Sequence, residues 1–195
     1  MHERLVVATG KRVHLRPPEA ADQKRFIAQA RASRALHNGW VQAPETPAAY
    51  RSFIARYSVE AGMPRHVGFV VVRNEDGALA GVVNFSEIVR GAFHNAYVGY
   101  YALAPLAGDG YMTEGFALAL DFAFRRLKLH RVEANVQPGN RRSLKLVERL
   151  GFEREGYSRR YVKIGGRWRD HVRYAMLAED WAKRRVEARR RIAQR

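Results

Sequence analysis

Cysteine is absent from the 195 residues of the chain, and its absence excludes disulfide bonds, thiolate metal sites and a cysteine nucleophile. Long apolar runs are absent too, since none approaches the ~20 residues that a membrane-spanning helix needs. The opening residues 1–4 do not begin a signal peptide, and no repeat or Pro/Ser-rich linker divides the chain. We therefore expect one domain, cytoplasmic and without a membrane partner.

Acidic residues are few. The chain holds 19 Asp and Glu against 35 Lys and Arg, which gives a formal net charge of +16. Such a charge attracts nucleic acid, ribonucleoprotein or a polyanionic cofactor, although a solvated basic surface explains it equally well. Residues 183–195 hold seven basic residues and one acidic residue. We expect them to form an exposed helical tail behind a domain of residues 1–182, with salt-sensitive affinity for ribosomal RNA.

Hydrophobic periodicity predicts strands and helices along the whole chain. The clearest helix begins near Thr46, which can cap it, and Pro47, which suits a first helical turn. The segment 74–77 between two β-rich runs indicates a hairpin. The predicted strands are 13–16, 67–73, 79–86, 96–103, 131–137, 153–164 and 168–177, and the predicted helices are 18–33, 47–57, 111–127 and 141–150.

The segment from Gly110 to Phe152 carries the most information. A glycine turn opens its first helix, so unpaired backbone N–H groups are presented to an anion. A strand follows, with apolar and polar side chains on opposite faces. A second helix then begins at Asn140, a capping residue, and ends at Gly151. This order suits a long pyrophosphate-bearing cofactor, for which acetyl-CoA is the best candidate.

Several short motifs occur along the chain in a fixed order. They are Gly81–Ser86, Val89–His94, Val98–Tyr100, Gly110–Glu114, Leu129–Arg131, Asn140 with Ser143, Arg149–Phe152, Glu155–Tyr157 and Gly166–His171. Together they resemble the GNAT superfamily of acyl-CoA N-acyltransferases, and within it the RimJ-type ribosomal-protein-alanine N-acetyltransferases. The resemblance is strong over residues 80–181 and loose before them. It implies an α/β fold with a mixed, mostly antiparallel, twisted sheet of six to seven strands, splayed at its centre, flanked by about four helices and followed by the basic C-terminal helix.

The resemblance also implies where the cofactor lies. In the family the pantetheine arm fills the gap beside the splayed central strand, like an added strand. The pyrophosphate motif falls on residues 107–112, where Ala107 lacks a polar side chain and Asp109 places a negative charge near the phosphates. We therefore expect weakened rather than abolished cofactor binding. The implied cofactor-binding residues are Tyr101, Ala102, Leu103, Gly108, Asp109, Gly110, Tyr111, Met112, Thr113, Asn140 and Ser143.

The implied reaction is the attack of an amine on a thioester, which needs an oxyanion donor and a proton for the departing thiolate. A backbone N–H near Leu103 is the predicted oxyanion donor. Many relatives protonate the thiolate with a tyrosine seven residues after the motif asparagine, a position that is Val147 in this chain. Ser143, which the resemblance places beside the sulfur, is the predicted replacement.

The base that accepts the amine proton is left open. Some relatives carry a carboxylate at the position of Asn135. Glu133 and Glu87 are the candidates, and each taken alone fits a surface carboxylate better. An α-amino group has a pKa near 7.7–8.0 and is partly neutral at pH 7, whereas a lysine amine near 10.4 needs a strong base. The missing base therefore favours an N-terminal amine as acceptor, with water as a possible relay.

Four aromatic residues, Trp40, Tyr157, Tyr161 and Trp168, are candidates for the acceptor-binding wall, although aromatic side chains are most often core residues. No metal is expected, because Asp170 and His171 lack further clustered ligands. The expected activity is acetyl transfer to the N-terminal alanine of a ribosomal protein by a monomer or homodimer. The alternatives are a small-molecule amine as acceptor, and a ribosome- or RNA-binding module with degraded catalysis.

Overall fold

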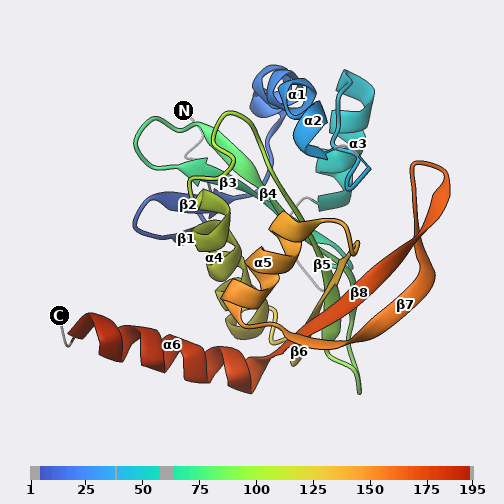
Figure 1. Cartoon of the computed structure of the whole chain (residues 1–195). Helices are drawn as coiled ribbons and strands as arrows, with labels where there is room; N and C mark the ends of the chain where they lie inside the picture. The colour runs from blue at the N-terminus through green and yellow to red at the C-terminus, as the bar shows by residue number, and fades with distance from the viewer. Residues whose placement is uncertain (1–4, 38, 58–63, 194–195) are drawn as a thin grey trace.

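An open eight-stranded sheet forms the centre of the molecule (Figure 1). The computed structural model describes residues 5–37, 39–57 and 64–193, with side chains up to Glu187. The strand order is β1-β2-β3-β4-β5-β6-β8-β7, and every neighbouring pair is antiparallel except β5 and β6, which are parallel. The strands are β1 (Ala8–Thr9), β2 (Val13–Arg16), β3 (Val67–Arg73), β4 (Leu79–Val89), β5 (Asn95–Ala102), β6 (Arg131–Val136), β7 (Glu153–Ile164) and β8 (Arg167–Leu177).

Helices cover both faces of the sheet (Figure 1). Side chains of α4 and α5 pack with one face in a large apolar core, and those of α1 and α3 pack with the other face in a second core. Alternate residues of β5 serve the two cores, because Val98 faces the first and Tyr101 the second. The helices are η1 (Ala20–Asp22, a 3₁₀ turn), α1 (Gln23–Ala32), α2 (Arg34–His37), α3 (Pro47–Tyr57), α4 (Tyr111–Arg125), α5 (Arg141–Leu150) and α6 (Ala178–Ala193).

The predicted fold class is confirmed, with two differences in the number of elements. The sheet has eight strands rather than six to seven, because the two-residue strand β1 pairs with β2. The one-turn helix α2 was not predicted, since four residues are too few to show helical periodicity. Strand β4 also runs to Val89 instead of ending at Ser86, and it passes through Glu87 at a φ of +48°.

Local capping signals place the start of α3 and both ends of α5 as predicted, whereas α1 begins at Gln23 and α4 ends at Arg125, inside their predicted ranges. The hydroxyl of Thr46 accepts a hydrogen bond from the N–H of Ala49 at 3.2 Å, which fixes the start of α3. The side chain of Asn140 accepts from the N–H of Ser143 at 3.2 Å and caps α5. Gly151 ends α5 at a φ of +86°, a conformation that disfavours residues with a Cβ.

A buried ion pair ties β2 to the turn before α1. The guanidinium of Arg16 donates two hydrogen bonds of 2.7 Å to the carboxylate of Asp22, and both side chains are at most 1% exposed. Asp22 also accepts from the N–H of Glu19 and from Arg25. Burial alone would raise the pKa of Asp22, but the hydrogen bonds and charge of Arg16 outweigh it, so the pKa of the carboxyl is lowered.

The basic C-terminal segment belongs to α6, which starts five residues before Lys183. Trp181 is buried, and its indole N–H donates to Asp121 of α4 at 2.7 Å. Arg185 pairs with the same carboxylate, and Arg184 donates to the carbonyl of Arg149 at the end of α5. The first part of the basic segment is therefore held against the domain. Across the described ranges, none of the helices has the length and apolar character needed to span a bilayer.

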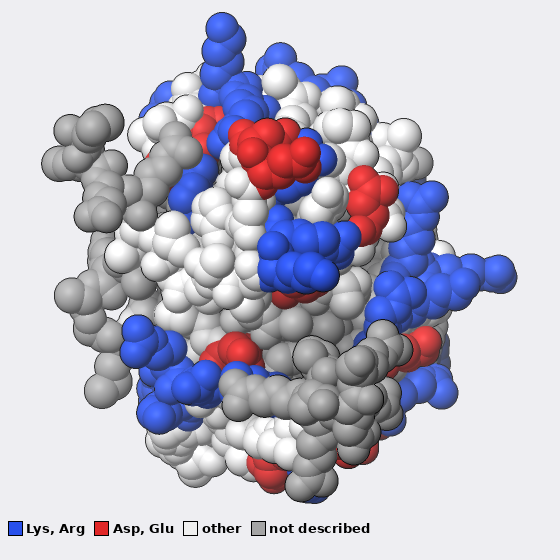
Figure 2. Space-filling view, turned by 90° about the vertical axis from the view of Figure 1, so that its left-hand side faces the viewer, with Lys and Arg blue, Asp and Glu red and all other residues white. Residues whose placement is uncertain are grey.

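Figure 2 views the molecule from the left-hand side of Figure 1, and on this face the positive charges do not form a single patch. Figure 2 shows separate clusters of Lys and Arg on this face, with Asp and Glu side chains beside them and uncharged surface between them. Charged neighbours of opposite sign screen one another, so the described part of this face does not form one continuous polyanion-binding surface.

Candidate active site

A gap opens between the two parallel strands at the centre of the sheet. Strands β5 and β6 pair only at Asn95–Tyr97 with Arg131–Glu133, so the rest of β5 has no strand partner on that side. Backbone groups along an unpaired strand edge are available to a ligand that adopts an extended form. This short pairing agrees with the splayed sheet centre that the family resemblance implies.

The direction of the backbone groups of β5 follows from one hydrogen bond. The N–H of Leu103 donates to the carbonyl of Ala80 at 2.8 Å, so Leu103 faces β4. In an antiparallel ladder alternate residues face the same neighbour, so the backbone groups of Ala102 and Tyr100 face the gap. The N–H of Leu103 is therefore already engaged and its side chain is buried. The N–H of Ala102 is the free donor at this position.

The turn before α4 is built from glycines in the left-handed conformation. Gly108 has a φ of +110° and Gly110, the N-cap residue, a φ of +84°. The first N–H groups to bond back to Gly110 are those of Thr113 and Glu114. The N–H groups of Tyr111 and Met112 consequently have no partner within the helix. These donors and the helix dipole can hold a phosphate group.

A basic side chain that sequence reasoning missed, Arg12, lies over this turn. Its guanidinium donates to the carbonyl of Asp109 at 3.1 Å and to Glu114 at 3.2 Å, and it stacks 4.9 Å from the ring centroid of Tyr111. A Cβ at Gly110 would come within 3.1 Å of it. Arg12 supplies positive charge at a loop whose own residues lack it. The 97 residues between Arg12 and Asp109 leave no local signal of this contact.

The start of α5 brings Ser143 to the side of the gap that α4 covers. The hydroxyl of Ser143 is hydrogen-bonded to the phenol of Tyr100, a β5 residue that belongs to the Val98–Tyr100 motif but was not among the predicted site residues. The N–H of Ser143 is held by Asn140. Val147, one helical turn further on, is fully buried in the core and offers no proton. Ser143 is therefore the hydroxyl that α5 presents near β5.

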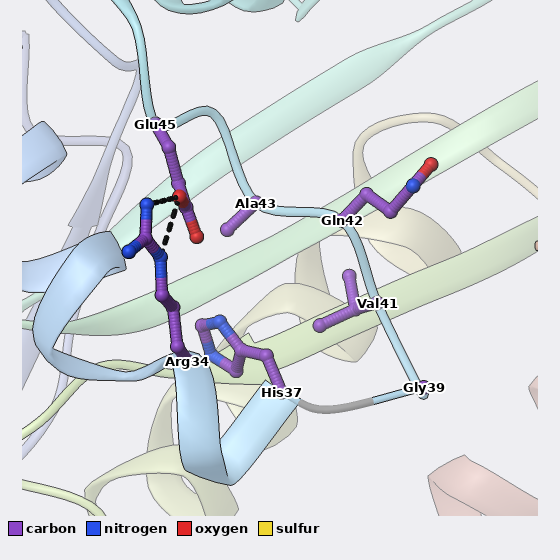
Figure 3. A pocket seen from close by; sticks show the side chains of 7 residues that line it. All are labelled: Arg34, His37, Gly39, Val41, Gln42, Ala43 and Glu45. Carbon is purple, nitrogen blue, oxygen red and sulfur yellow. Dashed lines mark hydrogen bonds and ion pairs between the residues drawn. The ribbon is translucent and has the colours of Figure 1, made fainter. Parts of the chain in front are cut away.

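A cavity of about 350 Å³ lies next to α2 (Figure 3). The ring of His37 projects from α2 into this region, beside the ion pair between Arg34 and Glu45, whose closest atoms are 2.5 Å apart. The His37 ring also packs edge-on against Tyr101 of β5. The cavity is lined by Arg34, His37, Gly39, Val41, Gln42, Ala43 and Glu45.

His37 contacts the gap directly. Its Nε2 lies 2.7 Å from the carbonyl oxygen of Ala102. A carbonyl can only accept, so Nε2 carries the hydrogen and, in the neutral ring, Nδ1 keeps a lone pair. Tyr101 and Tyr100 point to opposite faces of β5. His37 and Ser143 therefore flank the gap from its two sides.

The two predicted carboxylate bases lie at the other end of the strands, where β5 and β6 are paired. Glu133 is in register with Tyr97 and accepts from Arg131 at 2.9 Å. Glu87 is 51% exposed and accepts from Arg65 at 2.8 Å. Each carboxylate is engaged by an arginine, and neither lies beside Ala102. His37, in contrast, contacts the backbone of Ala102 directly.

The four aromatic candidates divide into two groups. Trp40 packs over Gly139, next to the cap of α5, where a Cβ would come within 3.0 Å of the indole. The other three lie on the β7–β8 hairpin, which projects beyond the sheet (Figure 1). There Tyr157 donates to Asp170 at 2.5 Å, Tyr161 packs near His171, and Trp168 is 60% exposed.

The neighbours Asp170 and His171 do not point to a metal centre. Asp170 accepts from Tyr157 and from the N–H of Arg160, and the Nδ1 of His171 lies 3.0 Å from the carbonyl of Arg169. Burial lowers the pKa of His171. Within the described residues there is no group of three or more His, Asp or Glu side chains that could hold a metal ion.

Comparisons with known proteins agree with this geometry. A family model described as an acetyltransferase (GNAT) domain matches residues 12–153. The chain is 34% identical over 175 residues to a protein of Bacillus subtilis named probable N-acetyltransferase YjcK, which covers 88% of this chain and 97% of that protein. It is 44% identical over 107 residues to the [ribosomal protein uS5]-alanine N-acetyltransferase of Escherichia coli, which covers 55% of each.

A solved structure extends the comparison to the whole fold. The RimJ protein of Mycobacterium smegmatis, solved in complex with CoA-disulfide, superposes with a TM-score of 0.80 at 29% sequence identity. The match covers 90% of this chain and 88% of that protein.

Proposed function

The chain belongs to the GNAT acetyltransferase family, and from this premise we propose that it transfers the acetyl group of acetyl-CoA to the N-terminal α-amine of a protein, most simply an alanine on a ribosomal protein. GNAT acetyltransferases use acetyl-CoA, the name of the E. coli relative supports this acceptor class, and the M. smegmatis structure contains a CoA derivative. The observation that carries the proposal is the gap beside β5, with Ser143 on one side and His37 on the other.

The residues around the gap fit acetyl-CoA. The unpaired edge of β5 at Tyr100 can pair with an amide of pantetheine, and Ala102 lies beside it at the thioester end. The turn at 108–112 offers backbone donors for the pyrophosphate, with Arg12 as the adjacent cation. Asn140 and Ser143 stand at the start of α5, near the unpaired part of β5. We assign these residues, with Thr113 of the first turn of α4, to cofactor binding.

Each reacting group has a candidate partner in the chain. Acetyl-CoA supplies an acetyl group whose C–S bond breaks as the C–N bond to the acceptor amine forms. We assign the N–H of Ala102 to stabilise the oxyanion and the lone pair of His37 Nδ1 to take the amine proton. We assign the hydroxyl of Ser143 to donate to the departing sulfur. One proton leaves the amine and one joins the thiol, so protons balance overall.

An assay with the purified protein, acetyl-CoA and peptides that begin with alanine tests the function. We expect acetyl-CoA to raise the melting temperature and mass spectrometry to find acetylation at the peptide N-terminus. The same peptide with a blocked N-terminus and an internal lysine should stay unmodified. Acetylation of polyamines or aminoglycosides but not of peptides would transfer the assignment to a small-molecule acceptor. The proposal would be refuted if acetyl-CoA did not stabilise the protein and no amine were acetylated.

The pyrophosphate turn gives two opposed predictions about affinity. Asp109→Asn removes a negative charge beside the phosphates and should lower the Kd for acetyl-CoA about two- to fivefold, whereas Arg12→Gln should raise it by a similar factor. Both effects should shrink as salt increases. Isothermal titration calorimetry at low and high salt measures them, with Asp180→Asn, which breaks the pair with Lys183 on α6, as the control. Equal affinities for all four proteins would show that the backbone alone holds the phosphates.

The assignment of the base predicts a change in the pH profile. His37→Gln keeps a donor toward the carbonyl of Ala102 but removes the Nδ1 lone pair. Because an α-amine is about one-tenth neutral at pH 7, we expect kcat/KM to fall about tenfold at pH 7 and to approach the wild-type value near pH 9. Glu133→Gln and Glu87→Gln should retain the wild-type profile. A loss confined to Glu133→Gln would return the role to that carboxylate.

The basic C-terminal segment and the exposed aromatic side chains are the candidate surfaces for macromolecular partners. We propose that residues 1–182 form the catalytic domain, that the exposed residues of 183–195 contact ribosomal RNA, and that the exposed aromatic side chains Tyr157 and Trp168, with Trp40 and Tyr161, receive the acceptor. Truncation after Lys183 should weaken salt-dependent RNA binding without abolishing acetylation. RNA binding without any turnover in the intact chain would instead favour a binding module.

A further inference from the structure

Tyr100 is a partly buried phenol without an assigned role in the proposed reaction. Its ring packs 4.7 Å from that of Phe116 in the core under α4. Its hydroxyl is hydrogen-bonded to the hydroxyl of Ser143 and lies 3.4 Å from the carbonyl oxygen of the same residue. A phenylalanine would fill the same space, so packing explains the ring but not the oxygen.

The direction of this hydrogen bond follows from the chemistry of the two groups. Burial raises the pKa of the Tyr100 phenol well above its usual range, so it stays protonated. A phenol is a stronger donor than an aliphatic hydroxyl. The Ser143 hydroxyl is nearer to the phenol than the Ser143 carbonyl is, so Tyr100 donates its one hydrogen to the hydroxyl oxygen, and the hydrogen of Ser143 is left for another acceptor. The hydrogen bond from the N–H of Ser143 to Asn140 fixes the residue from its backbone side as well.

We infer that Tyr100 is a positioning residue of the acetyl-transfer step, whose phenol holds the Ser143 hydroxyl as a donor toward the departing sulfur. The inference rests on the proposed function. It also accounts for the absence of a tyrosine at the position of Val147 on α5. Val147 is buried in the core, whereas a tyrosine 43 residues before Ser143 in sequence reaches it from β5. The proton donor is thus a pair of hydroxyls from two elements.

Tyr100→Phe tests the inference, because it removes one oxygen and keeps the ring. We expect kcat to fall about five- to tenfold, as for loss of one neutral hydrogen bond, with KM for acetyl-CoA and peptide within about twofold. In the Ser143→Ala background the same change should have no further effect. Tyr174→Phe is the matched control. Tyr174 belongs to the same core and donates to Glu148 at 2.9 Å, and its loss should leave kcat unchanged.

A second readout does not depend on turnover. Ultraviolet titration of the thiol of bound CoA reports its pKa, which a hydroxyl donor lowers because it stabilises the thiolate. The thiol pKa should rise in Tyr100→Phe and Ser143→Ala and stay unchanged in Tyr174→Phe. Melting temperatures check that each variant is folded.

The outcomes separate the inference from the proposed function. A wild-type kcat and thiol pKa in Tyr100→Phe, or additive losses in the double variant, would overturn the inference while acetylation stands. A wild-type protein that binds CoA but acetylates no amine would overturn the proposed function. The thiol titration would then still decide whether Tyr100 acts through Ser143.

Discussion

Asp22→Ala is expected to lower the free energy of unfolding by about 3–5 kcal/mol, because it leaves the guanidinium of Arg16 buried without its partner. Arg16 is fully buried and makes two 2.7 Å hydrogen bonds to this carboxylate. Urea unfolding followed by circular dichroism measures the loss. Asp76→Ala breaks the exposed pair with Arg73 and should cost far less.

The destabilisation should depend on pH with a definite sign. The pKa of Asp22 is lowered in the folded protein, so its contribution to stability is fully present above the unfolded pKa of about 3.9 and is lost as the pH falls through the folded pKa. The difference in free energy of unfolding between the wild type and Asp22→Ala should therefore be constant from pH 5 to 7 and shrink below about pH 4.

A double replacement of the buried pair, Arg16→Met with Asp22→Leu, should recover much of the lost stability. Equal losses in Asp22→Ala and Asp76→Ala would show that the buried pair does not hold β2 to α1.

Ser143→Ala is expected to lower kcat by roughly 10²–10⁴-fold, the range for loss of a positioned acid. The change removes the hydroxyl held by Tyr100 but leaves the N–H that Asn140 caps. The Kd for acetyl-CoA should consequently stay within about threefold of the wild-type value. Steady-state kinetics with an alanine peptide and calorimetry with acetyl-CoA measure the two quantities.

The control for this change is Ser52→Ala, which removes an exposed hydroxyl from α3 and should leave kcat unchanged. Ser143→Thr keeps a hydroxyl and should recover part of the activity. A Ser143→Ala enzyme with wild-type kcat would show that the thiolate receives its proton from solvent, and the role of Tyr100 would fall with that of Ser143.

Features encoded within a few residues could be predicted from the sequence. The cap at Asn140 and the stop at Gly151 define α5 because both act on their own helix. The glycine turn at Gly110 is local in the same sense. The family motifs then placed the gap beside Ala102, although they did not show that Leu103 turns its N–H to Ala80.

Contacts between distant segments could not be predicted. His37 reaches Ala102 across 65 residues, and Arg12 reaches the turn before α4 across 97. Both depend on how the sheet and α2 pack, which no local pattern encodes. The roles of Glu133 and Glu87 as bases stay predictions, and the arginines that engage both carboxylates were not foreseen either. Glu133 lies on the same face of β6 as Asn135, but β5 and β6 are still paired at Glu133, which is in register with Tyr97.

The short pairing of β5 with β6 also has a mechanical consequence. Five strands lie on one side of this seam and three on the other, and only three residue pairs join them across the sheet. An extended ligand that pairs with both strands would join the two halves of the sheet. Part of its binding free energy would then hold the two halves together, so the free energy of unfolding would increase with the concentration of acetyl-CoA.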